Sequence, residues 1–324
     1  MARGRSTPEP SGRTDPPGQA ETAGVPLDLP GITRVAGPLR AGLVLTAFMG
    51  LTLPLMPVQY LLLRAWPTGA RHLPYWYHRA VCRLLGIRFK ISGRIARDRP
   101  VLVVANHVSW LDIPVLSAVA PLSFIAKREV GAWPFVASLA RLQRTVFVDR
   151  TRRSAVHDVT REMADRLRGG DTLVLFAEGT STDGNRVLPF KSALFSAVFQ
   201  GNTDNLSIQT LALTYTHLHG VPLGRADRSM VGWYGDMEMG DHAWTLLKAG
   251  PLDVTIEIGP PVPLGNFATR KSLAGHTESI VRRAVVSALR GLPADRQDDQ
   301  SVAAPTESAG HTAPASDRVA SKRA

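Results

Sequence analysis

Short apolar runs rich in β-branched residues alternate with amphipathic stretches between about residue 89 and residue 292. Runs of this length, bounded by polar or turn-forming residues, are typical of β-strands. We therefore predict strands over residues 101–105, 123–126, 145–148, 172–176, 208–215 and 254–258. Apolar residues at helical spacing predict helices over 154–167 and 273–289. Strands separated by helices predict an α/β domain whose buried sheet is flanked by helices.

Before this domain, residues 41–63 form an uncharged apolar run. As one continuous helix the run would be about 35 Å long, which is enough to cross a bilayer core of about 30 Å. Pro54 and Pro57 interrupt the run, and each removes a backbone donor and clashes with the preceding turn. We therefore expect two apolar half-helices, with a kink between them, that dip into one leaflet of a membrane. A full span and a buried core helix are the alternatives.

Arginines and aromatic residues are mixed in the segment that follows the apolar run. Such a mixture is typical of a membrane–water interface, where rings lie at headgroup depth and cations contact anionic lipid. We therefore predict that residues 31–88 associate with an anionic membrane surface and that the domain after them faces the cytoplasm. The residues concerned are Arg64, Trp66, Arg71, Tyr75, Trp76, Tyr77, Arg79, Arg83, Arg88 and Lys90.

Composition and charge limit the domain organisation and the kinds of partner and metal site that we expect. Residues 1–30 and 293–324 are poor in large apolar residues, which predicts disordered tails around a central domain over 89–292. The net charge of +11 favours an anionic partner, but no motif of a nucleic-acid-binding module is present. The one cysteine, Cys82, allows no disulfide within the chain and no cysteine-based zinc site.

The first candidate site lies where the predicted strand 101–105 ends. Asn106 and His107 follow the strand directly, and Asp112 comes where a helical pattern begins. A neutral imidazole can take a proton from an attacking hydroxyl, and a carboxylate on its other ring nitrogen fixes the tautomer. The spacing equally allows a satisfied polar histidine followed by an aspartate that caps a helix.

The second candidate site lies after the predicted strand 172–176, which runs directly into small and charged residues. A strand end with small residues, exposed amides and cations is suited to binding an anion. A glycine turn with solvated charges is the alternative. The residues of interest are Glu178, Gly179, Thr180, Arg186 and Lys191.

The third candidate site is the charged pair Asp149–Arg150, which follows the predicted strand 145–148. Arginine suits phosphate because its planar guanidinium donates two parallel hydrogen bonds. A surface ion pair is the alternative.

The order and separation of these segments resemble the PlsC-type glycerolipid acyltransferases, the lysophosphatidic acid acyltransferase family, from about residue 60 to residue 290. The family's motif of Asn-His, four residues and Asp is matched by Asn106, His107 and Asp112. Its arginine-bearing strand end is matched by Phe147, Asp149 and Arg150, and its Phe-Pro-Glu-Gly-Thr-Arg motif by Phe176, Glu178, Gly179 and Thr180. A fourth, apolar segment corresponds to residues 211–213.

Two positions depart from the family pattern, because Ala177 replaces the usual proline and Ser181 replaces the usual arginine. The lost arginine weakens the match to a phosphate-bearing acceptor, although Arg186 or Lys191 could supply the charge. The segments DGNRVLPFKSALF, from Asp183, and WYGDMEM, from residue 233, resemble a bacterial branch that acylates lyso-ornithine lipid.

The resemblance implies an O-acyltransferase at the bacterial inner membrane that moves a fatty acyl group from acyl-CoA or acyl carrier protein to the hydroxyl of a lyso-lipid. It implies that His107 is the general base and that Asp112 orients it and balances its charge. No metal, no cofactor beyond the acyl donor and no nucleic-acid partner is expected. Substrate binding is assigned to Asn106, Arg150, Glu178, Gly179, Thr180, Arg186 and Lys191.

Two lipid acceptors fit this chemistry. The resemblance points first to 1-acyl-sn-glycerol-3-phosphate, which would give phosphatidic acid, and the alternative is lyso-ornithine lipid. A non-catalytic membrane protein that binds lipid is an alternative of a different class. His107, Asp112 and Glu178 argue against it, since a scaffold has no need of a base with an orienting acid.

Overall fold

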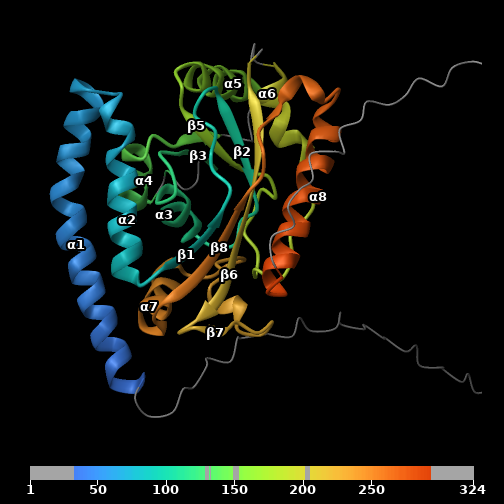
Figure 1. The fold of residues 1–324 in the computed structure, drawn as a ribbon. Coiled ribbons are helices and arrows are strands. Elements are labelled where there is room, and N and C mark those ends of the chain that lie inside the picture. The colour runs from blue at the N-terminus through green and yellow to red at the C-terminus, as the bar shows by residue number, and fades with distance from the viewer. Residues whose placement is uncertain (1–32, 128–130, 132, 149–152, 201–204, 293–324) are drawn as a thin grey trace, which may run out of the picture. The chain divides into compact units, whose positions relative to one another are not determined.

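The computed structural model describes residues 33–127, 131, 133–148, 153–200 and 205–292. The two tails predicted to be disordered lie outside these residues. In the described part, a sheet lies between two layers of helices, and one long helix stands beside one of these layers (Figure 1).

The described strands form one nine-stranded sheet, whose main path runs β1, β8, β6, β2, β5, β3, β4. The strands from β6 to β4 along this path are parallel, whereas β8 is antiparallel to β6 and parallel to β1. The short strands β7 and β9 pair with β6. The bounds are β1 Arg88–Ser92, β2 Val101–Ala105, β3 Ser123–Lys127, β4 Val146–Val148, β5 Thr172–Phe176, β6 Ser207–Leu218, β7 Val221–Pro222, β8 Leu252–Ile258 and β9 Val262–Pro263.

The six predicted strands are all present, with ends that differ by a few residues at most. The strand β1 was not predicted. It forms one edge of the sheet, and most of its side chains are exposed, so it lacks the apolar run by which the buried strands were recognised.

The central strand β2 shows how the sheet separates two hydrophobic cores. All five of its residues are buried, and they alternate between the two faces. One face packs against α2, α3 and α7, and the other against α5, α6 and α8. The predicted α/β fold with flanking helices is therefore confirmed. The helix bounds are α2 Leu73–Leu85, α3 Asp112–Ser117, α4 Pro134–Leu142, α5 Arg153–Arg168, α6 Ser196–Gln200, α7 Met239–Ala249 and α8 Arg270–Leu289, with short 3-10 helices at Gly69–Arg71, Ser192–Phe195, Arg228–Met230 and Leu264–Asn266.

The apolar run forms one continuous helix, α1, over Thr33–Ala65, so the predicted break into two half-helices is wrong. A proline inside a helix costs about 3 kcal/mol, but its backbone angle is compatible with the helix. Contacts of α1 with α2, α4 and α7 offset this cost. The hydroxyls of Thr52 and Tyr77 are hydrogen-bonded at 2.7 Å, and Gln59 Nε2 donates to the carbonyl of Leu142 at 2.9 Å.

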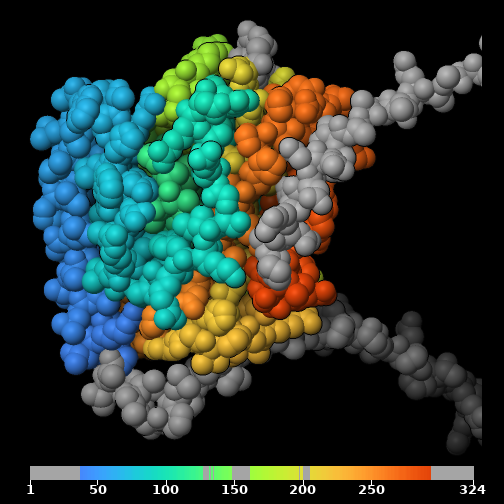
Figure 2. Space-filling view, viewed as in Figure 1, coloured from blue at the N-terminus to red at the C-terminus, as the bar shows by residue number. Residues whose placement is uncertain are grey.

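The side of α1 that faces away from the sheet is apolar and exposed. The part from Gly37 to Ala65 is long and apolar enough to cross a membrane, with a mean hydropathy of 1.8, and 17% of its most apolar window is buried. This low burial argues against a core helix of a soluble protein. Figure 2 shows α1 as the outermost layer beside α2. The exposed leucines are Leu39, Leu43, Leu45, Leu53 and Leu61.

A buried carboxylate, that of Asp171, lies among three arginines. Asp171, which directly precedes β5, is buried and lies 3.0 Å from Arg71 and 2.8 Å from Arg144. Arg166 of α5 donates to the same carboxylate. The three arginines come from segments far apart in the chain, so this carboxylate fixes how they pack.

Candidate active site

The strand order brings the first two candidate segments together. The strands β2 and β5 are parallel neighbours in which Ala105 pairs with Phe176, so both end at the same edge of the sheet. His107 follows β2 and Glu178 follows β5 at equivalent positions. The backbone N–H of His107 donates to Glu178 Oε1 at 2.8 Å.

The side chains of His107 and Asp112 form the predicted pair. His107 Nδ1 lies 2.7 Å from Asp112 Oδ2. The same oxygen accepts the backbone N–H groups of Val108 at 2.7 Å and Ser109 at 3.0 Å. A capping aspartate would accept from amides that follow it, so the capping alternative is wrong. Asp112 is fully buried, whereas His107 is 19% exposed, and its Nε2 is the ring nitrogen that remains for a substrate hydroxyl.

Tyr215 on β6 is a member of the site that sequence reasoning missed. Its hydroxyl donates to Asp112 Oδ1 at 2.8 Å. Burial, together with the charge of Asp112, raises the pKa of Tyr215 well above its usual value, so the hydroxyl keeps its proton. The alternation of side chains along a strand places Tyr215 on the face that carries Leu211 and Leu213, and this signal was available in the sequence.

Asn106 and Glu178 hold the backbone of the site in place. The side chain of Asn106 donates to the carbonyl of Leu213 at 2.9 Å and accepts from its N–H at 2.8 Å. Glu178 is buried, and its second carboxylate oxygen accepts from the N–H of Leu188 at 2.7 Å. Burial raises the pKa of Glu178 to about 7, against the two amide hydrogen bonds, which lower it. Glu178 therefore links two loops through their backbones.

Aromatic rings support the imidazole of His107. The ring of Phe176 stacks on it with centroids 4.1 Å apart and planes 17° apart. Phe124 in turn stacks on Phe176, with ring centroids 6.1 Å apart. This stack fixes the plane of the imidazole, while Asp112 fixes the ring nitrogen that faces inward.

For the remaining predicted substrate-binding residues, the structure gives backbone conformation or exposure only. Gly179 adopts a φ of +71°, a conformation that favours glycine, and it forms the turn after β5. Thr180, Arg186 and Lys191 are exposed. Arg150 lies outside the described residues.

Ser181, which departs from the family pattern, contacts Trp233, the first residue of the segment WYGDMEM. The hydroxyl of Ser181 donates to the carbonyl of Trp233, and the N–H of Trp233 donates to the carbonyl of Val108 at 3.0 Å. Trp233 is thus held next to the turn that carries His107 and Val108. Its ring meets that of Trp133, at the start of α4, edge to face at 5.8 Å. Sequence reasoning noted the segment but gave Trp233 no role.

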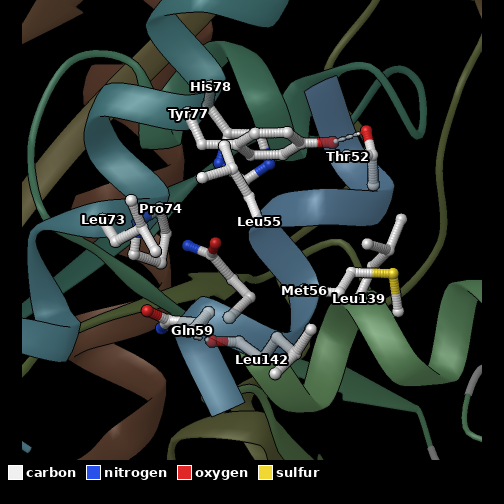
Figure 3. Close-up of a pocket in the computed structure, with 11 residues that line it drawn as sticks. Thr52, Leu55, Met56, Gln59, Leu73, Pro74, Tyr77, His78, Leu139 and Leu142 are labelled. Atoms are coloured by element: carbon white, nitrogen blue, oxygen red, sulfur yellow. Dashed lines mark hydrogen bonds between the residues drawn. The ribbon is translucent and has the colours of Figure 1, made fainter. Parts of the chain in front are cut away.

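A cavity of about 50 Å³ lies elsewhere, between α1, α2 and α4 (Figure 3). Leu55, Met56 and Leu139 contribute apolar walls. Gln59 and His78 also line it, and each has a buried atom without a hydrogen-bond partner among the described residues. None of the predicted site residues lines this cavity.

Comparisons with known proteins agree with this geometry. The acyltransferase family model matches residues 86–214. The lyso-ornithine lipid O-acyltransferase of Brucella abortus is 46% identical over 79% of this chain and 97% of that protein. The corresponding enzyme of Rhizobium meliloti is 41% identical over 74% of this chain and 84% of that protein.

Two further proteins are more distant. The 1-acyl-sn-glycerol-3-phosphate acyltransferase of Neisseria meningitidis is 31% identical over 64% of this chain and 78% of that protein. The crystal structure of the lysophosphatidic acid acyltransferase PlsC from Thermotoga maritima matches with a TM-score of 0.56 and 23% identity, over 78% of this chain and 94% of that chain. This last match supports the fold alone. Because the more similar relatives align over most of their length and the family model spans the site, the chain belongs to the PlsC-type glycerolipid acyltransferase family and is an acyltransferase.

Proposed function

We propose that this enzyme transfers a fatty acyl group from the thioester of acyl-CoA or acyl carrier protein to the hydroxyl of lyso-ornithine lipid. The observation that carries the proposal is the contact of 2.7 Å between His107 Nδ1 and Asp112 Oδ2, at a strand end where His107 Nε2 remains for a substrate. A base fixed in one tautomer by a carboxylate can activate a hydroxyl without a protein nucleophile.

In the proposed reaction, the acceptor hydroxyl gives its proton to His107 Nε2 as its oxygen attacks the thioester carbonyl. Asp112 stabilises the imidazolium that forms, and backbone amides would stabilise the oxyanion of the tetrahedral intermediate. The intermediate collapses by breaking the carbon–sulfur bond. The leaving thiolate takes the proton from His107, which returns to its neutral form beside an ester product.

The choice of acceptor reverses the order given by the family resemblance alone. The relatives at 46% and 41% identity are named for lyso-ornithine lipid, whereas the glycerol-phosphate enzyme of Neisseria meningitidis is 31% identical. Ser181 stands where the family has an arginine, and its hydroxyl is used by the carbonyl of Trp233. A cation for a phosphate is therefore missing at this position.

The proposal places the reaction at the cytoplasmic face of a bacterial inner membrane. The exposed leucines of α1 form an apolar surface, and the arginines and aromatic residues after it suit an anionic lipid interface. The exposed side chains of Trp66 and Trp76 are 62% accessible each, as expected for residues at headgroup depth.

An acyl-transfer assay on the purified chain in mixed micelles tests the function. Acyl-CoA and acyl carrier protein donors are each offered with lyso-ornithine lipid and with lysophosphatidic acid. We expect transfer to lyso-ornithine lipid, and none from the His107→Ala variant. Transfer only to lysophosphatidic acid would overturn the acceptor while keeping the chemistry. Binding of either lipid without turnover would favour the non-catalytic alternative.

A further inference from the structure

The side chain of Asn185 lies between two opposite charges, those of Arg228 and Asp183. Arg228 Nη1 donates to Asn185 Oδ1 at 3.0 Å. The backbone N–H and the Nδ2 of Asn185 donate to the two carboxylate oxygens of Asp183, at 3.0 and 3.1 Å. The neutral amide therefore lies between the guanidinium and the carboxylate. Among the described residues, neither charge has an opposite partner within salt-bridge distance.

The charged trio, Asp183, Asn185 and Arg228, is connected to the backbone of the candidate base through Thr182, which directly precedes Asp183. The backbone N–H and the hydroxyl of Thr182 both donate to the carbonyl of His107, at 3.1 and 3.2 Å. A Cβ added at Gly184 would lie 3.2 Å from Val108 Cγ1 and 4.0 Å from Arg228 Cβ. The loop that carries Asp183 and Asn185 therefore packs against the turn formed by His107 and Val108.

Both charges keep capacity for a ligand. Within the described part of the chain, the one hydrogen bond of the Arg228 side chain is that to Asn185, and its buried Nε has no partner. Each oxygen of Asp183 accepts one hydrogen bond where a carboxylate oxygen can accept two. All three side chains are partly exposed. A guanidinium suits a carboxylate, and a carboxylate suits an ammonium group.

We propose that Arg228 binds the carboxylate, and Asp183 the ammonium group, of the zwitterionic amino-acid headgroup of lyso-ornithine lipid. This inference rests on the proposed function. Ornithine that is acylated on its α-nitrogen keeps its carboxylate and its terminal ammonium group, and both are joined through the amide to the chain that bears the acceptor hydroxyl. A phosphate monoester carries only negative charge, so it would gain from Arg228 but be repelled by Asp183.

The test pairs charge-removing variants with acceptors that lack one charge. The acceptors are N-(β-hydroxyacyl)ornithine, the matching putrescine amide without the carboxylate, and the matching norvaline amide without the ammonium group. We expect Arg228→Gln to lower kcat/KM for the ornithine acceptor by about ten- to a hundred-fold and to leave that for the putrescine amide nearly unchanged. Asp183→Asn is expected to lower kcat/KM for the ornithine acceptor by a similar factor and to leave kcat/KM for the norvaline amide unchanged.

Two charged residues just before Arg228 supply control variants. Arg225→Gln and Asp227→Asn make the same charge changes outside the trio and are expected to leave all three acceptors within about two-fold of wild type. The inference is overturned if Arg228→Gln loses as much on the putrescine amide as on ornithine. Equal use of the three acceptors by the wild type overturns it as well, and this comparison needs no variant to fold. A wild type that ignores N-acyl-ornithine altogether refutes the proposed function itself.

Discussion

The hydroxyl of Tyr215 donates to Asp112 Oδ1 at 2.8 Å, across 103 positions of the chain. Asp112 Oδ2 is hydrogen-bonded to His107 and to two backbone amides. Tyr215 supplies a hydrogen-bond partner for the second oxygen, Oδ1. A buried carboxylate oxygen that lacks a partner carries the full cost of its desolvation, which makes the position of Asp112 less favourable. Tyr215 is therefore a positioning residue that acts on His107 through Asp112.

From this arrangement we predict that Tyr215→Phe lowers kcat by about ten-fold and changes KM for the acceptor little. The ring still fills its place in the core, but Asp112 no longer fixes the imidazole as firmly. Steady-state kinetics in mixed micelles measure both constants. Tyr77→Phe is the control, since it removes a hydroxyl bonded to Thr52 instead. A rise in KM with unchanged kcat would contradict a positioning role.

Removing the imidazole tests the base directly. We predict that His107→Ala lowers kcat/KM by about 10²–10⁴-fold, the usual contribution of general base catalysis. The exposed His72 provides the control variant His72→Ala. Near-normal turnover in the His107→Ala variant would exclude His107 as the base.

The sequence predicted those features that depend on neighbours in the chain. The apolar runs of β2 and β5 were recognisable because both strands are buried on both faces, and the parallel pairing of such strands brings His107 and Glu178 together. The pairing of His107 with Asp112 follows from a turn between a strand and a helix. These are local relationships, and the pattern of residues contains them.

Other features depend on contacts that the local pattern does not contain. The bond from Tyr215 to Asp112 joins β6 to α3, and no short motif encodes it. Glu178 has the same sequence context whether its carboxylate faces a substrate or two backbone amides. The prolines of α1 predicted a break because a single helix was considered alone, whereas packing against α2, α4 and α7 keeps it continuous.

The raised pKa of Glu178 predicts how stability depends on pH. The folded protein holds this proton up to a pH of about 7, whereas the unfolded chain releases it near 4.5. The folded state therefore binds more protons between these values, and its free energy of unfolding declines by roughly 3 kcal/mol as the pH rises through that window. Denaturant unfolding in detergent at several pH values measures this decline.

In Glu178→Gln the contribution to that decline should be absent, so the free energy of unfolding should depend less on pH between 4.5 and 7. Glu238→Gln, at an exposed position, should follow the wild-type curve. Parallel curves for the wild type and Glu178→Gln would show that Glu178 is not buried with a proton.

The cluster around Asp171 predicts a large loss of stability. We expect Asp171→Asn to lower the free energy of unfolding by about 3–5 kcal/mol, because Arg71, Arg144 and Arg166 lose a buried partner. The matched control is Asp165→Asn, which breaks a pair with Arg168 at the surface and should cost about 1 kcal/mol or less. Similar losses in both variants would mean that the buried cluster adds nothing beyond a surface ion pair.

The outward face of α1 predicts membrane binding that can be separated from folding. Leu53 and Leu61 are more than half exposed, and a buried leucine contributes about 1.5–3 kcal/mol when it leaves water. Leu53→Glu combined with Leu61→Glu should therefore reduce binding to anionic vesicles by at least ten-fold in a flotation assay. Activity in micelles should persist, because the side of α1 that contacts α2 and α4 is unchanged. Val286→Glu, an exposed change on α8, should bind vesicles like the wild type. If the double variant binds equally well, α1 is not the surface that enters the lipid, and the basic and aromatic residues after it must hold the enzyme at the membrane by themselves.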